Sequence, residues 1–159
     1  MQFRVGISQT NKNLFNFTRI RTMNKNYIFE LEMAVRDYEC DIEGIVNNAN
    51  YLHYMEHTRH QFLLTEHVRF IDLHERGIDC VVARVNIAFK TPLHSDEHFL
   101  SCINVLKEGV KYVFEQDIYR LPDRQMVVRA RVDTVCLVQG RLADCEELNQ
   151  AFGKYFLPK

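Results

Sequence analysis

A carboxylate side chain, Asp41, lies in a turn that contains Gly44 and leads directly into an amphipathic segment beginning near Asn48. The start of a helix has unpaired backbone N–H groups and a partial positive charge, so it attracts anions and developing oxyanions. A carboxylate a few residues before such a start could act on a carbonyl group that the helix polarises. Turn aspartates also commonly hold a loop in place, and the nearby Asp37 and Glu39 could be auxiliary groups.

Other reaction types have weaker support. His53 and His57 have the i, i+4 spacing that can share a metal ion, and His60 follows, but no acid or cysteine completes an obvious ligand set. We predict that these histidines form an exposed or subunit-interface face. Cys40 lies in an acidic stretch that would raise the pKa of its thiol, and no G-x-S-x-G, P-loop or dinucleotide-binding glycine motif is present. We therefore expect neither a metal nor a redox cofactor.

The bulk properties limit the class of protein. A chain of 159 residues is long enough for one domain with a real core and short for two. A net charge of −1 argues against nucleic acid as the main partner. No run of 18 apolar residues is present, so no membrane span is expected. Five cysteines without C-x-x-C or metal-ligand spacing predict free thiols in a reducing, cytoplasmic environment.

The first part of the chain differs in composition from the remainder. Residues 1–22 are basic and contain no acid, so we predict an N-terminal extension before a single domain over residues 23–159. One interpretation is an upstream extension, with Met23 as the natural initiator. The other is a targeting peptide, although the segment has no contiguous apolar region and secretion is not expected.

The elements that must position Asp41 follow from hydrophobic periodicity. Residues 27–35 alternate apolar and polar side chains, as in a half-buried strand. A long helix is predicted from Asn48–Asn50, which are good capping residue types, to about Glu66. Its apolar side is predicted to comprise Tyr51, Leu52, Tyr54, Met55, Arg59, Phe62 and Leu63.

The remainder of the sequence is dominated by strand patterns. A short helix over residues 68–75, closed by Gly77, is followed by four consecutive alternating segments, the last ended by Gly140. A short helix over residues 145–152 closes the chain. Consecutive strands favour an antiparallel sheet, and a single amphipathic helix needs the apolar face of that sheet to cover it.

The run of residues 41–51, followed by Glu56 and Arg59, resembles the signature of hotdog-fold acyl-CoA thioesterases of the 4-hydroxybenzoyl-CoA thioesterase type. Residues 89–97 also resemble the strand, proline-containing loop and acid of that family, and the likeness covers roughly residues 27–142. The resemblance implies an α+β hotdog fold, in which a curved five-stranded antiparallel sheet wraps around one long central helix.

The same resemblance assigns roles to individual residues. It implies that Asp41 is the catalytic carboxylate, as general base toward water or as nucleophile. The backbone N–H of Asn48 would polarise the thioester oxygen, and Glu56 would border the site. Asn47 and Glu43 depart from the usual residue types, which affects the expected shape of the acyl pocket. The predicted substrate-binding positions of the motif are Gly44, Val46, Asn47 and Tyr51.

The substrate implied by the resemblance is an acyl-CoA thioester, with CoA as part of the substrate. CoA carries phosphates, so basic side chains are expected near the mouth of the cleft. The candidates are Lys90, Arg84, Arg129 and Arg131, although solvated strand faces explain them equally well. We take Lys90 as substrate-binding.

The implied assembly is a homodimer or homotetramer, with sheets joined edge to edge and the site at the subunit boundary. An acyl-ACP thioesterase is the first alternative function, but residues 30–159, with 15 basic and 21 acidic side chains, offer no obvious docking patch for an acidic carrier protein. A non-catalytic acyl-CoA-binding protein is the second. A hydratase ranks last, because no histidine lies in the Asp41 turn.

Overall fold

The structure of the protein, a computed structural model, describes residues 26–156. Its elements are β1 (Phe29–Ala34), the short 3₁₀ helix η1 (Asp37–Glu39), α1 (Asn48–Thr65), α2 (Phe70–Glu75), β2 (Ile78–Phe89), β3 (His98–Glu108), β4 (Lys111–Arg120), β5 (Met126–Val138), β6 (Arg141–Ala143), α3 (Glu146–Phe152) and the 3₁₀ helix η2 (Gly153–Tyr155). The predicted extension over residues 1–22 lies outside the described residues.

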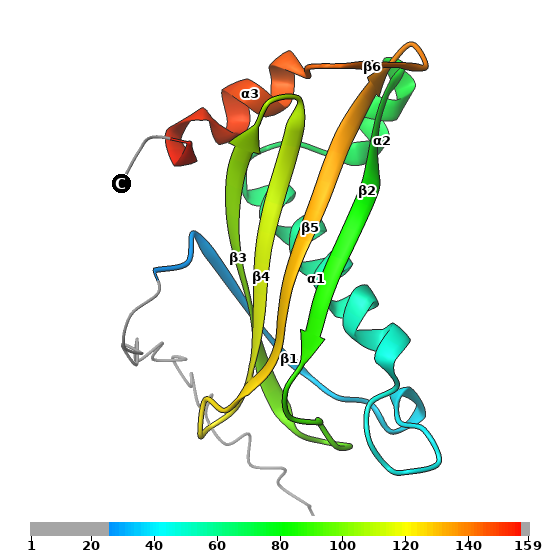
Figure 1. Ribbon diagram of the computed structural model, residues 1–159, viewed down its shortest axis with the longest axis vertical. Helices are drawn as coiled ribbons and strands as arrows, with labels where there is room; N and C mark the ends of the chain where they lie inside the picture. The colour runs from blue at the N-terminus through cyan, green and yellow to red at the C-terminus, as the bar shows by residue number, and fades with distance from the viewer. Residues whose placement is uncertain (1–25, 157–159) are drawn as a thin grey trace, which may run out of the picture.

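The strands form one curved antiparallel sheet in the order β1-β3-β4-β5-β2, and α1 runs along one face of it (Figure 1). The helix is 18 residues long and contacts β3 and β1. The predicted hotdog fold with its five-stranded sheet is confirmed. A sixth strand, β6, pairs with β5 and was not predicted, because three residues are too few to show an alternating pattern.

The core lies between α1 and the sheet. The buried side chains of the helix are Tyr51, Tyr54, Met55, Thr58, Phe62 and Leu63. The predicted apolar side is therefore largely correct, but Leu52 is wrong, since 44% of it is exposed. Thr58 is buried instead, because its hydroxyl donates to the carbonyl of Tyr54 and lies 2.7 Å from the Ser101 hydroxyl. A polar residue can occupy this position when its hydrogen bonds are made inside the protein.

Two further features of the helices agree with the sequence patterns. The exposed histidine face of α1 is confirmed for His53, His57 and His60. α2 is closed by Gly77, whose φ of +78° is the left-handed conformation that glycine adopts at low cost. Within residues 26–156, no helix is both long and apolar enough to cross a lipid bilayer.

The edge strand β2 contains an irregularity that the sequence pattern did not indicate. Its pairing with β5 skips Ala83, so Val82 lies opposite Thr134 and Arg84 lies opposite Asp133. Such a β-bulge places two residues against one and reverses the alternation of side chains beyond it. The single alternation predicted along this strand is therefore wrong. Val85 faces the core side of the sheet, while Val81, on the other side of the bulge, faces outward.

Candidate active site

The turn that carries Asp41 is closed by backbone hydrogen bonds. The Asp41 N–H donates to the carbonyl of Ile45 at 2.8 Å, and the Gly44 N–H donates to the carbonyl of Asp41 at 3.0 Å. Gly44 has a φ of +74°, which a residue with a Cβ atom rarely adopts. One carboxylate oxygen of the half-buried Asp41 accepts the N–H of Glu43 at 3.1 Å. The other carboxylate oxygen has no hydrogen bond within residues 26–156.

Glu39 connects this turn to the helix that follows it. Its carboxylate, in a residue only 8% exposed, accepts the hydroxyl of Tyr54 at 2.6 Å and the backbone N–H of Arg36 at 2.8 Å. Its backbone carbonyl accepts the N–H of Asn47 at 3.0 Å and the side-chain amide of Asn50 at 2.7 Å. Glu39 therefore fixes the start of α1 relative to the Asp41 turn. The sequence indicated this residue only as a nearby carboxylate, since its partner Tyr54 is 15 positions away.

The N-terminus of α1 is only partly capped. The side-chain oxygen of Asn47 accepts the N–H of Ala49 at 3.0 Å, and the Asn47 carbonyl accepts the N–H of Asn50 at 2.9 Å. These bonds bypass Asn48, whose backbone N–H has no acceptor among the described residues. The first turn of the helix thus presents a free N–H donor, where the partial positive charge of the helix is concentrated.

A cavity of about 210 Å³ lies directly against this end of the helix. Its walls come from the segment after Asp41, from the first turn of α1 and from the end of β2. The lining residues are Ile45, Val46, Asn48, Tyr51, Phe89, Lys90, Thr91 and Pro92. Apolar walls with a few convergent polar groups are typical of small-molecule sites.

Tyr51 joins two of these walls. Its ring lies 5.6 Å from that of Phe89, and its hydroxyl accepts the N–H of Leu93 at 3.1 Å. Burial raises the pKa of the Tyr51 hydroxyl, so it stays protonated. The N–H of Val46 donates to the carbonyl of Leu93 at 2.8 Å, and Ile45 forms an isolated bridge with His94. The loop after β2 is thereby held against both the helix and the Asp41 turn.

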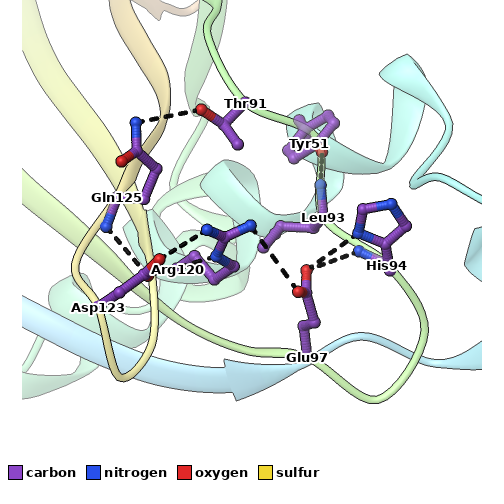
Figure 2. A network of polar contacts seen from close by, with 8 residues as sticks. All are labelled: Tyr51, Thr91, Leu93, His94, Glu97, Arg120, Asp123 and Gln125. Carbon is purple, nitrogen blue, oxygen red and sulfur yellow. Dashed lines mark hydrogen bonds and ion pairs between the residues drawn. The ribbon is translucent and has the colours of Figure 1, made fainter.

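A polar network supports the same loop from the side of the sheet (Figure 2). The carboxylate of Glu97 accepts the N–H of His94 at 2.8 Å and lies 3.9 Å from the guanidinium of Arg120. Arg120 also donates to Asp123 at 2.6 Å. On the opposite side of Arg120, the side-chain amide of Gln125 donates to the hydroxyl of Thr91 at 3.4 Å. The network connects the cavity wall to the turn between β4 and β5.

The structure places the predicted site residues in two groups. Those that line the cavity are Val46, Asn48, Tyr51 and Lys90. Those that do not are Asp41, Gly44, Asn47 and Glu56. Three of the second group have local roles in the turn or the cap, and Glu56 is exposed about two turns after the start of α1. Phe89 and Pro92 line the cavity without having been predicted as binding residues, although both belong to the segment over residues 89–97 whose sequence resembled the family.

The other basic candidates lie elsewhere. Arg129 and Arg131 alternate with the core residues of β5 and so lie on the outer face of the sheet. Arg129 lies 3.5 Å from Asp117, and Arg131 pairs with Glu108 at 2.6 Å. Arg84, on β2, lies opposite Asp133, and Lys90 is the one of the four candidates that lines the cavity. Within residues 26–156, no group of three or more His, Cys, Asp or Glu side chains could hold a metal ion.

Cys40 is a poor nucleophile, as its sequence context indicated. Desolvation raises the pKa of its thiol, and the negative charges of Asp41 and Glu39 raise it further. A thiol with a raised pKa is mostly protonated at neutral pH, and the thiolate is the reactive form.

A curved antiparallel sheet covered by one long helix is the arrangement of a hotdog fold, and here a cavity lies at the start of that helix. The chain belongs to the thioesterase-like superfamily, whose sequence profile matches residues 35–152.

Individual relatives support the same class. The chain is 33% identical over 111 residues to the chloroplastic acyl-acyl carrier protein thioesterase ATL2 of Arabidopsis thaliana, in a match that covers 68% of this chain and 58% of ATL2. It thus spans little more than half the length of that relative. YneP of Bacillus subtilis, named as a candidate acyl-CoA thioesterase, is 30% identical over 114 residues, covering 70% of this chain and 80% of YneP.

Among solved structures, the fold is similar to that of Slr0204, a 1,4-dihydroxy-2-naphthoyl-CoA thioesterase from Synechocystis. The TM-score is 0.75 at 18% identity, covering 82% of this chain and 98% of that one. The DHNA-CoA thioesterase from Staphylococcus aureus has a TM-score of 0.72 at 17% identity, covering 79% and 88% of the two chains. At these identities the likeness concerns the fold.

Proposed function

We propose that this protein hydrolyses acyl-CoA thioesters to a free acid and CoA. The observation that carries the proposal is the free N–H of Asn48, which lies at the start of α1 and against an apolar cavity, seven residues after Asp41. A thioester needs a donor where negative charge develops on its oxygen and a carboxylate near its carbonyl carbon. We assign these two roles to the N–H of Asn48, at the cavity, and to the carboxylate of Asp41, in the turn before the helix.

The proposed reaction uses only side chains and water. The thioester oxygen accepts the N–H of Asn48, and the carboxylate of Asp41 either takes a proton from an attacking water or attacks the carbonyl carbon itself. The carbon–sulfur bond then breaks, and the thiolate of CoA takes up a proton. In the second route the acyl group remains on Asp41 as a mixed anhydride, which a water molecule hydrolyses to the free acid, restoring the carboxylate. Lys90, which lines the cavity, pairs with a phosphate of CoA at its mouth.

We further propose that the active form is a dimer or a pair of dimers. β2 is an edge strand, and its residues 81–86 are all exposed, including three valines. An exposed, apolar edge strand is a surface that proteins normally cover. A second copy that pairs with this edge would also lie beside Phe89 and complete the site near Asp41.

Light scattering after gel filtration tests the assembly. We expect a mass of at least twice the 18.9 kDa of one chain. Val85→Lys would add a charge to the edge of β2 and is expected to shift the mass toward that of one chain. Val110→Lys, at an equally exposed position in the β3–β4 turn, is the matched control and should leave the mass unchanged. A wild-type protein that runs as a single chain would contradict the proposed dimer.

One observation favours acyl carrier protein, in place of CoA, as the carrier of the acyl group. It is the 33% identity to an acyl-acyl carrier protein thioesterase. The net charge of −6 over residues 30–159, from 15 basic and 21 acidic side chains, disfavours it, because an acidic carrier protein would be repelled. Thiol release from the same acyl chains on CoA and on carrier protein decides between them. We expect a kcat/KM at least about tenfold higher on CoA, which corresponds to ~1.4 kcal/mol. A preference for the carrier protein would overturn the choice of CoA.

A further inference from the structure

Three cysteine side chains meet at the end of the sheet that is farthest from the cavity. Cys80, near the start of β2, lies directly opposite Cys136 of β5 in the antiparallel register. Their sulfur atoms are 3.4 Å apart. The thiol of Cys145, which precedes α3, also hydrogen-bonds to Cys136. Phe89 at the cavity is nine residues further along β2, or about 30 Å away at the usual strand rise.

The backbone geometry at the first two of these cysteines suits a disulfide. Residues directly opposite each other in an antiparallel pair have Cα atoms roughly 4.5 to 5.5 Å apart. This range lies inside the separation that disulfides require. Rotation of the two side chains, without movement of the backbone, would therefore be enough to bring the sulfur atoms from 3.4 Å to the length of an S–S bond. The other two cysteines differ, because Cys40 pairs with Val46 and Cys102 lies between Glu30 and Asp117 in the sheet.

The three thiols differ in their access to a dissolved oxidant. Cys80 is half-buried, whereas Cys136 and Cys145 are buried. The hydrogen bond to Cys145 lowers the pKa of the Cys136 thiol, but the hydrogen bond with Cys80 and burial outweigh it and raise that pKa to about 12. Cys136 is thus a protonated, inaccessible thiol, and Cys80 is the member of the pair that an oxidant reaches first.

We propose that Cys80 and Cys136 are a site of reversible oxidation, forming a cross-strand disulfide when the protein meets a hydroperoxide. The sulfur of Cys80 attacks one oxygen of hydrogen peroxide, which breaks the O–O bond and gives a sulfenic acid and one water. The sulfur of Cys136 then attacks the sulfur of Cys80, its proton leaves with the hydroxyl group as a second water, and the S–S bond forms. Two thiols are oxidised and one peroxide is reduced.

The disulfide would act on the edge strand. β2 is bonded to the sheet on one side only, through β5, and its exposed residues 81–86 begin immediately after Cys80. A covalent link at this point holds the beginning of the strand in register with β5 whatever occupies its free edge. The inference is independent of the proposed substrate, since neither cysteine lines the cavity.

Peptide mapping of the full-length protein tests the proposal. The protein is treated with a small excess of hydrogen peroxide, its remaining thiols are blocked, and the digest is analysed by mass spectrometry. We expect two of the five thiols to be lost, a peptide pair that links Cys80 to Cys136, and complete recovery of the thiols with dithiothreitol. Cys80→Ser and Cys136→Ser should each abolish the linked pair, whereas Cys102→Ser, which lies in the same sheet, should retain it.

The alternatives give different products. A wild-type disulfide between Cys136 and Cys145 would overturn the assignment, as would a sulfinic acid on Cys80 with Cys136 still a free thiol. Retention of all five thiols while added glutathione is oxidised in the same tube would also overturn it. Because the decisive map is that of the wild type, a serine variant that folds poorly does not affect the outcome.

Discussion

Asp41→Asn is expected to lower the rate of thioester hydrolysis by about a hundredfold or more, in line with the loss of a positioned acid–base group. Asparagine keeps an oxygen that can accept the N–H of Glu43, so the turn should be preserved. It cannot take a proton from water or attack a carbonyl carbon at neutral pH. The measurement is thiol release from a panel of short, long and aromatic acyl-CoAs, with wild type and variant compared at equal concentrations.

The matched control is Asp37→Asn, four residues earlier in the same loop. Asp37 is exposed, and its carboxylate accepts the N–H of Tyr38, a bond that asparagine can also make. This variant should hydrolyse the panel at the wild-type rate. If Asp41→Asn is as active as the wild type, or if the two variants lose activity equally, Asp41 is not the reaction centre and another group must supply the chemistry.

Glu39→Ala is expected to destabilise the protein by about 3 kcal/mol, because it removes a buried, charged acceptor and leaves the hydroxyl of Tyr54 without its partner. The backbone bonds of Glu39 to Asn47 and Asn50 remain, so the fold should be retained. Chemical denaturation measures the loss. Glu30→Ala, on an exposed position of β1, is the control and should stay within about 0.5 kcal/mol of the wild type. A loss for Glu39→Ala as small as that of the control would contradict the assigned role.

The contribution of Glu39 should also depend on pH. Burial raises the pKa of its carboxyl, but the hydrogen bonds from Tyr54 and Arg36 outweigh burial and hold the pKa below the ordinary value of 4.5. The unfolded state therefore takes up its proton at a higher pH than the folded state. The stabilisation is present above pH 4.5 and is lost as the pH falls through the lowered pKa. Glu39→Gln should differ from the wild type most at neutral pH and least in acid, and a constant difference would count against this account.

Local patterns predicted the elements well, because each depends on its own residues. α1 begins at Asn48 as predicted, although its cap is Asn47, one residue before the predicted capping residues, and Gly77 closes α2 as predicted. The alternation of β5 also placed Arg129 and Arg131 on the face opposite the core. These features follow from sequence neighbours at most a few residues apart.

The candidate site could be predicted only in part, since it combines distant segments. Asn48 and Tyr51 were found because they lie in one motif, but Phe89 joins them only through the place of β2 in the sheet. The pairing of Glu39 with Tyr54 likewise depends on how the loop folds back over the helix. Helical periodicity placed Leu52 in the core, whereas the packing of α1 on β3 turned it outward.

The bulge at Ala83 has a consequence for how the length of β2 can change. Side chains alternate with a period of two, so the skipped residue is what allows Cys80 and Phe89, nine positions apart, to face the same side of the sheet. Deleting Ala83 would merge the two halves into one alternation, and either the sulfur pair or the cavity wall would then turn to the outer face. We therefore expect the insertion or deletion of one residue in this strand to be costly, whereas a change of two residues keeps the alternation of side chains. The side chains of β2 alternate with a period of two, and the one extra residue, Ala83, lets both ends of the strand present a side chain to the same face.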